Sequence, residues 1–194
     1  MKKSIKFKAI LIVFSLIGLG LTSCSKDDDT IKPNKKVKVE DVYGSYSGKA
    51  ITSQDKVKNE KNVNFSAKAG VISFTELPVK EIVSTVVGDS KKTEEALKAL
   101  GKVKYNLDYK AALNKNSTAV ELTFVPKALE LKVPIDGKVK NVKVIFSAKD
   151  KGIYVSGKSN VVKFGFTVSE LTIDEVLESR LVPINYAFPA SVKK

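Results

Sequence analysis

Carboxylates are the side chains of this 194-residue sequence that could support catalysis. Two acids that face each other across a cleft can hydrolyse a glycosidic bond. Four acids lie singly in segments that alternate like strands: Asp108, Glu121, Glu130 and Asp136. The chain has no histidine, which excludes Ser-His-Asp arrangements and histidine metal sites, and no tryptophan on which a sugar could stack. Because no pattern brings the four acids together, we interpret them as solvent-facing partners of lysines and predict no enzyme activity, cofactor or metal.

The single cysteine, Cys24, lies where an uncharged segment ends. Four lysines precede that segment, which covers residues 9–21 and is shorter than the ~20 apolar residues of a spanning helix. A basic region followed by a short apolar region is typical of a signal peptide. A buried structural cysteine is the alternative, but the chain has no second cysteine that could pair with it. We therefore predict that residues 1–23 are a signal peptide.

The residues around Cys24 resemble a known processing motif. Leu21-Thr22-Ser23-Cys24 is similar to the bacterial lipobox, in which an aliphatic residue and two small residues precede the cysteine. The resemblance implies that the thiol receives a diacylglyceryl group, that the chain is cut before Cys24, and that the new amine is acylated by a fatty acid such as palmitate.

Acidic residues follow Cys24 directly. The stretch "CSKDDD" resembles the export signal of Bacteroidetes lipoproteins, which directs them to the outer face of the outer membrane. The residues of the signal would be Lys26, Asp27, Asp28 and Asp29. The alternatives are a solvated run of charges or a calcium contact. A calcium loop needs oxygen ligands at spaced positions around a glycine turn, and consecutive aspartates offer neither. The resemblance implies a protein that faces the cell exterior and is anchored to the outer membrane by the lipid on Cys24.

A second short motif overlaps this signal. Asp29-Thr30-Ile31 resembles the site at which the same phylum O-glycosylates exported proteins, which implies a glycan on Thr30.

Lysine supplies nearly all of the positive charge. The formal net charge is +13 at pH 7, and Arg180 is the only arginine. Nucleic-acid readers rely on arginine for bidentate contacts and on aromatic side chains in a basic groove. Lysines spread along the whole chain favour solubility or attraction to anionic polymers instead. We predict no nucleic-acid partner, and a polyanionic surface polymer or a neighbouring outer-membrane protein as the partner.

The elements that carry these residues follow from composition and periodicity. Residues 24–40 are polar, rich in lysine and interrupted by Pro33, which predicts a flexible tether. The rest, residues 41–194, is predicted to form a single domain in which apolar and polar residues alternate. The alternating segments are 43–52, 63–67, 103–113, 120–124, 129–135, 142–148, 153–155, 162–168 and 182–188. Such a series predicts a mainly β fold, an antiparallel barrel or closed sandwich of about eight strands. In the shortest segment the predicted inward residues are Ile153 and Val155.

One segment, at about residues 78–100, departs from the alternation. Apolar residues recur at helical spacing after Pro78, which suits the first turn of a helix, and Gly88 ends this run. Asp89 or Ser90 can cap a second helix that Gly101 terminates. The sequence thus predicts a helical hairpin inserted after the second strand.

Three features together resemble a family of Bacteroidetes lipoproteins of unknown function with calycin-like barrels. They are the "YGSYSG" entry, the helical hairpin and the closing "PINYAFP", and the resemblance covers most of residues 41–190. Gly44-Ser45-Tyr46 lies where lipocalins have Gly-x-Trp. Calycins carry apolar ligands inside the barrel, and fatty-acid-binding proteins cover the mouth with a helical hairpin.

Two functions are compatible with such a barrel. An eight-stranded barrel is just wide enough for side chains to fill it, and five phenylalanines could do so: Phe65, Phe124, Phe146, Phe164 and Phe166. With a filled barrel, the protein would be a non-enzymatic binding or interaction module. With an open cavity, it would be a carrier of a small apolar or amphipathic ligand. We expect the interaction module.

Overall fold

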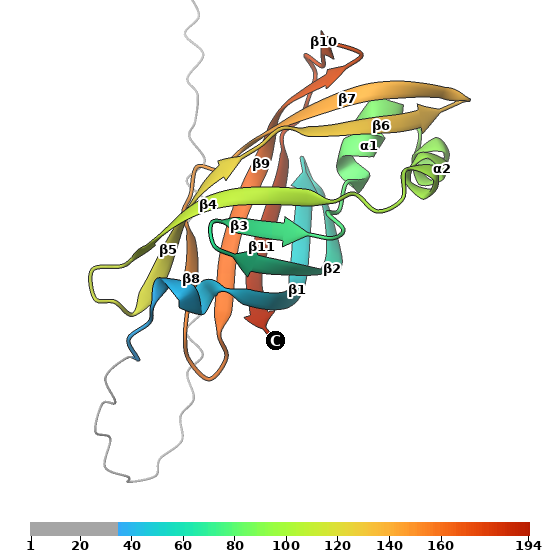
Figure 1. The fold of residues 1–194 in the computed structure, drawn as a ribbon. Coiled ribbons are helices and arrows are strands. Elements are labelled where there is room, and N and C mark those ends of the chain that lie inside the picture. Colours follow the sequence, from blue (N-terminus) through green and yellow to red (C-terminus); the bar gives the residue numbers. More distant parts are fainter. Residues whose placement is uncertain (1–34) are drawn as a thin grey trace, which may run out of the picture. The chain divides into compact units, whose positions relative to one another are not determined.

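The computed structural model describes residues 35–194, which form one compact unit (Figure 1). A short 3-10 helix, η1 (Val39–Val42), precedes the first strand. The strands are β1 (Gly44–Gln54), β2 (Val57–Lys68), β3 (Val71–Phe74), β4 (Tyr105–Leu113), β5 (Ala119–Pro126), β6 (Leu129–Ile135), β7 (Lys138–Ser147), β8 (Gly152–Val155), β9 (Val161–Ile173), β10 (Val176–Leu177) and β11 (Ile184–Lys193). The helices α1 (Lys80–Val87) and α2 (Ser90–Leu100) lie between β3 and β4.

Eight of the strands close into a barrel. Each of the strands β1 to β4 pairs with the next strand in the chain. Strand β5 pairs with β8, β8 with β9, and β9 with β11, which pairs with β1. All of these pairings are antiparallel. The ring therefore follows the order of the chain, and closure leaves no free edge along it. This confirms the predicted mainly β fold, a closed antiparallel barrel with an inserted helical hairpin.

The hairpin of β6 and β7 extends one wall beyond the ring. The strand β7 pairs with the second part of β9, whereas β8 pairs with the first part. The turn between β6 and β7 has positive φ at Asp136 (50°) and Gly137 (76°), as two-residue hairpin turns require. Helices α1 and α2 lie at this end of the molecule, and the C-terminus lies at the opposite end (Figure 1).

Aromatic side chains fill the interior. The rings of Phe164 and Phe188 stack with centroids 4.4 Å apart, and Phe65 lies 5.3 Å from Tyr46 and from Phe74. A second group packs nearer the helices: Tyr105, Phe146, Phe166 and Tyr186. The five phenylalanines expected inside the barrel are all at most 7% exposed. The inward rows of the strands therefore meet at the centre of the barrel.

The helical hairpin begins and ends close to the predicted residues. The Asp89 side chain accepts a hydrogen bond from the Lys92 N–H and caps α2, and Gly88 and Gly101 follow the two helices at positive φ. Pro78 does not occupy the first turn as predicted, because α1 begins at Lys80.

Two predictions about strands are wrong. The four-residue strand β3 was not predicted, so the helical hairpin follows the third strand and not the second. The face of β8 is also reversed: Tyr154 is 1% exposed and points inward, whereas Ile153 is 38% exposed. The inward neighbour of Tyr154 is Gly152, which has no apolar side chain, so the alternation favoured the outward row. A Cβ atom on Gly152 would lie 2.8 Å from the ring of Phe124.

No helix within residues 35–194 is both long enough and apolar enough to cross a membrane.

Candidate functional site

The predicted lipidation, export and glycosylation residues lie outside the described part of the chain. They are Cys24, Lys26, Asp27, Asp28, Asp29 and Thr30.

The four acids considered for catalysis do not form one site. Asp108 pairs with Lys127 at 2.6 Å, Glu121 with Lys151 at 2.7 Å and Asp136 with Lys92 at 2.6 Å. Glu130 lies opposite Lys143 in the pairing of β6 with β7. Asp108 and Glu121 are on neighbouring strands but four register positions apart, since Glu121 pairs with Ala112. Each acid therefore has a lysine beside it, and residues 35–194 contain no group of three potential metal-ligating side chains.

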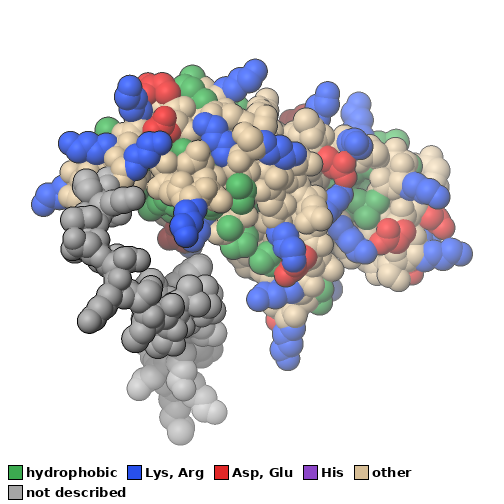
Figure 2. Space-filling view, turned by 90° about the horizontal axis from the view of Figure 1, so that it is seen from below, with side chains coloured by type: hydrophobic (Ala, Val, Ile, Leu, Met, Phe, Trp, Pro, Cys, Tyr) green, Lys and Arg blue, Asp and Glu red, His purple; other side chains and the backbone are tan. Residues whose placement is uncertain are grey.

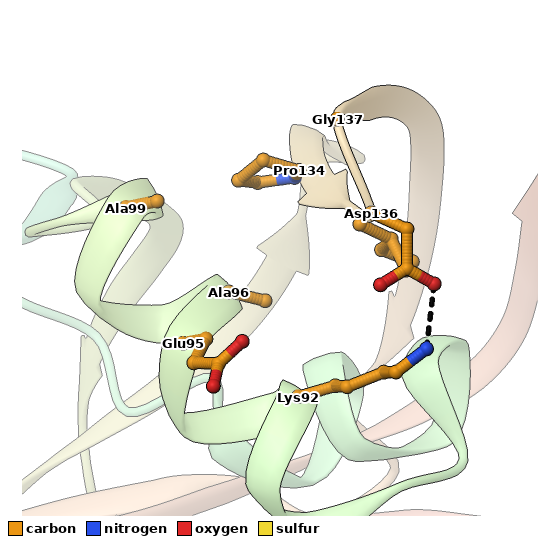
Figure 3. Close-up of a pocket in the computed structure, with 8 residues that line it drawn as sticks. Lys92, Glu95, Ala96, Ala99, Pro134, Asp136 and Gly137 are labelled. Carbon is orange, nitrogen blue, oxygen red and sulfur yellow. Dashed lines mark hydrogen bonds and ion pairs between the residues drawn. The ribbon is translucent and has the colours of Figure 1, made fainter.

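A small hollow lies between α2 and the turn of β6 and β7 (Figure 3). Its volume is about 180 Å³, and Ala96 and Ala99 of α2 face Pro134 across it. The ion pair of Lys92 with Asp136 bridges one side. Ligand pockets usually measure about 300–1,000 Å³. We interpret this hollow as a joint between the helical hairpin and the β6–β7 hairpin.

A wider and shallower hollow of about 570 Å³ lies on the outer wall, over β1, β2 and β11. It forms because Gly48 has no side chain and because β11 bulges at Pro189 and Ala190. Its polar lining consists of Ser47, Lys49, Asn62 and Asn64. Lys49 is the one charged residue in its lining, so the hollow does not indicate a particular ligand or reaction.

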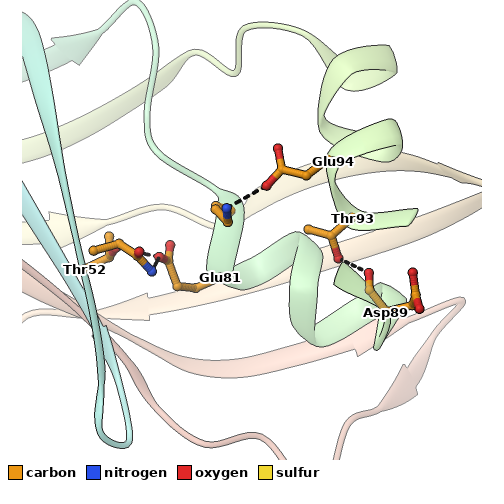
Figure 4. A network of polar contacts seen from close by, with 7 residues as sticks. Thr52, Glu81, Asp89, Thr93 and Glu94 are labelled. Carbon is orange, nitrogen blue, oxygen red and sulfur yellow. Dashed lines mark hydrogen bonds and ion pairs between the residues drawn. The ribbon is translucent and has the colours of Figure 1, made fainter. Parts of the chain in front are cut away.

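A buried carboxylate fastens the helical hairpin to the barrel (Figure 4). Glu81 of α1 is 5% exposed, and its Oε1 accepts hydrogen bonds from Thr52 Oγ1 and Asn59 Nδ2, both at 2.8 Å. Within residues 35–194, its Oε2 has no hydrogen-bond partner. Nearby, the Tyr186 hydroxyl donates to the Pro78 carbonyl oxygen at 2.7 Å. Burial, and then the neighbouring Glu81 charge, raise the pKa of Tyr186, which keeps it a neutral donor. These bonds hold α1 against β1, β2 and β11.

Replacing Glu81 by alanine should lower the free energy of unfolding by about 2 kcal/mol, because Thr52 and Asn59 lose their shared acceptor at a buried position. Glu81→Gln keeps one acceptor oxygen and should cost less. Glu95→Ala, on the exposed face of α2, is the control and should change stability by no more than about 0.5 kcal/mol. Urea unfolding measures all three, and equal values for the two alanine variants would contradict the fastening role.

Unpaired lysines gather at the end of the barrel where β1 begins and β11 ends. We call this surface the basic end. Chain segments meet here from across the sequence: the Val37 N–H donates to the Ser117 carbonyl oxygen, and the Lys193 N–H donates to that of Asn160. The basic end carries eight lysines: Lys35, Lys36, Lys38, Lys68, Lys115, Lys158, Lys193 and Lys194.

Few acids balance these charges. The same segments contain only Glu40 and Asp41, and within residues 35–194 none of the eight lysines forms an ion pair. Figure 2 shows the molecule from this side, with lysine side chains more frequent than acidic ones. At the helical end, carboxylates pair with three of the lysines: Lys80, Lys92 and Lys140.

The basic end was not predicted from the sequence. Its lysines are spread from residue 35 to residue 194, and no stretch of them is unusual beside the lysines elsewhere. Only the pairing of the strands brings the loops together. A usable signal was the distribution of acidic residues. The loops before β1, between β4 and β5 and between β8 and β9 contain few of them, which leaves their lysines without partners.

Comparison with known proteins gives a family without an assigned activity. A family model described as a domain of unknown function, DUF4840, matches residues 41–173, which run from η1 to the end of β9. No curated protein and no solved structure matches the chain.

Proposed function

The chain belongs to the DUF4840 family, and we propose that this member is an outer-membrane lipoprotein, exposed on the cell surface, that acts as a non-enzymatic interaction module for a polyanionic partner. The observation that carries the proposal is the filled barrel combined with the unpaired lysines of the basic end. A filled barrel has no room for a guest, so recognition falls to the outer surface.

The packing of the interior supports a module rather than a carrier. A carrier of a small ligand needs a connected cavity of about 300 Å³ or more. The centre of the barrel is instead occupied by stacked rings, such as Phe164 on Phe188 at 4.4 Å and Phe166 on Tyr186 at 5.0 Å. The helical hairpin would also have to open as a lid. Opening would break the bonds of Glu81 and Tyr186 and expose Ile82 and Val83, both of which are fully buried.

The charge of the surface supports the class of partner. Lysine ammonium groups are flexible point charges that suit a mobile polyanion, whereas arginine suits fixed bidentate contacts. Clustered charge of one sign attracts an opposite polymer over about one Debye length, or ~10 Å at 0.1 M salt. The lipobox around Cys24 and the aspartates after it support the location.

Two measurements test this function. The domain of residues 35–194 has its own core and should bind polyphosphate, an anionic polymer, but not neutral dextran, with an affinity that falls as salt rises. Native mass spectrometry of protein purified from its host should show no mass beyond the chain and its covalent modifications. A stoichiometric lipid-sized guest held by the domain would refute the module and favour the carrier.

A further inference from the structure

We propose that the basic end docks on phosphate-bearing lipid headgroups of the membrane that holds the Cys24 anchor. This proposal rests on the lipid anchoring of the proposed function and specifies its partner. The eight lysines would lie against the headgroups, and the helical end would point away from the membrane.

In the part of the chain that the structure describes, four lysines of the basic end are free charges. Lys36, Lys68, Lys115 and Lys158 are exposed, and within the described chain they have neither an ion pair nor a side-chain hydrogen bond. They come from four different segments: the one before η1, the end of β2, and the loops that follow β4 and β8. A rigid barrel therefore presents them as one surface, without the cost of ordering a disordered segment.

The backbone under this surface is well fastened. Val42 is fully buried, and its carbonyl oxygen accepts a hydrogen bond of 2.5 Å from the Tyr46 hydroxyl. The Lys193 ammonium donates to the Asp41 carbonyl oxygen at 2.9 Å, and the Lys194 N–H donates to that of Ser45. The segment before β1 and the C-terminal residues are thus hydrogen-bonded to each other at this end of the barrel.

The chain before the domain is short enough to keep the basic end within reach of the membrane. Lys35 lies eleven positions after Cys24. Even a fully extended chain of that length reaches at most about 40 Å, and it joins the domain at the basic end, where Val37 is already packed against the loop at Ser117. The helical end is at most the length of β1 farther along the molecule, about 35 Å for eleven residues, and less along the barrel axis because barrel strands tilt. The tether therefore attaches the domain at its basic end, and the charges of that end are what would turn it toward the lipid.

The energetics of such docking suit an auxiliary contact. Each lysine near an anionic membrane surface strengthens binding by about fivefold, and the effect falls off within a Debye length. A lipid chain combined with a basic patch gives more stable attachment than one chain alone. Docking through the basic end would also fix the orientation of the barrel, which a tether alone leaves free.

Vesicle sedimentation tests the proposal with the soluble domain of residues 35–194, so that no lipid anchor contributes. The domain should bind vesicles with about 30% phosphatidylglycerol and should not bind pure phosphatidylcholine vesicles. Binding should weaken as the salt concentration rises from about 50 to about 500 mM, because the Debye length becomes shorter. A basic-end variant should bind about a hundredfold more weakly or worse; it combines Lys36→Gln, Lys68→Gln, Lys115→Gln and Lys158→Gln.

The matched control removes the same charge elsewhere. It combines four exposed lysines without ion pairs: Lys56→Gln, Lys98→Gln, Lys132→Gln and Lys138→Gln. This variant should keep vesicle binding within about threefold of the unmodified domain, because charges more than a Debye length from the surface are screened. Circular dichroism checks that both variants are folded.

Three outcomes would overturn the docking. Equal losses in the two variants would mean that net charge alone drives binding. Binding to polyphosphate but not to vesicles would refute the membrane partner and leave the proposed function standing. Binding to neither would refute the docking and also the polyanionic partner. A guest found inside the barrel, in contrast, would refute the module but not the docking.

Discussion

Cells that produce the Cys24→Ala variant should contain a protein that is not lipidated and keeps its signal peptide uncut at residue 24. The thiol of Cys24 is the only cysteine thiol in the chain, so no other residue can accept the diacylglyceryl group. Each buried methylene of an acyl chain contributes about 0.8 kcal/mol to membrane binding. Loss of the thiol therefore removes the contribution of the diacylglyceryl group in one step. Mass spectrometry of the wild type should show an acylated N-terminal cysteine, and an intact N-terminus or cleavage elsewhere would contradict the prediction.

Replacing Asp27, Asp28 and Asp29 by alanine separates export from anchoring. This variant should remain lipidated, because the lipobox is unchanged, but it should stay on the periplasmic face. Protease added to intact cells should then degrade the wild type and spare the variant. If the two proteins are degraded equally, the aspartates are not an export signal. A mass shift that disappears in Thr30→Ala would locate the glycan in the same samples.

Much of the fold was predictable because its strands and helices follow patterns within short stretches of sequence. Alternation located the long strands, and positive-φ residues such as Gly88 and Gly101 ended the two helices where the sequence indicated. The strand β3 was missed because four residues after the turn at Gly70 are too few to establish a period. The face of β8 was reversed because its inward glycine, Gly152, carries no hydrophobic signal. Both errors occur where a short strand offers few residues to the pattern.

The features that matter for function were less predictable, since they depend on contacts between distant segments. Glu81 has the sequence context of an exposed helical residue, yet it is buried because Thr52 and Asn59 reach it from β1 and β2. The basic end likewise results from strand pairing: the loops that carry Lys115 and Lys158, 43 positions apart, are brought together by the pairing of β5 with β8. The local periodicity of the sequence does not indicate which distant residues come into contact.

Closure itself should depend on Gly48, where β1 meets β11. A Cβ atom there would lie 2.6 Å from Ser191 Oγ, 2.7 Å from the Ala190 carbonyl oxygen and 2.9 Å from Ser191 Cα. Two of these atoms belong to the backbone, which cannot move aside without opening the β1–β11 pairing. Gly48→Ala should therefore destabilise the domain by about 3 kcal/mol. For a domain of this size, that corresponds to a fall of roughly 6–12 °C in Tm, measurable by differential scanning calorimetry.

Two further variants show whether the backbone contact is the cause. Gly157→Ala is the matched control, since the nearest atom would be 3.7 Å away and φ is not positive; it should leave Tm unchanged or slightly higher. Ser191→Ala added to Gly48→Ala should not restore stability, because the Ala190 carbonyl oxygen and Ser191 Cα remain in place. If Ser191→Ala fully restores the stability lost in Gly48→Ala, the clash involves the Ser191 hydroxyl group alone. A Gly48→Ala domain as stable as Gly157→Ala would show that the β1–β11 seam is wider than 2.7 Å contacts allow, and the closed barrel on which the basic end depends would have to be revised.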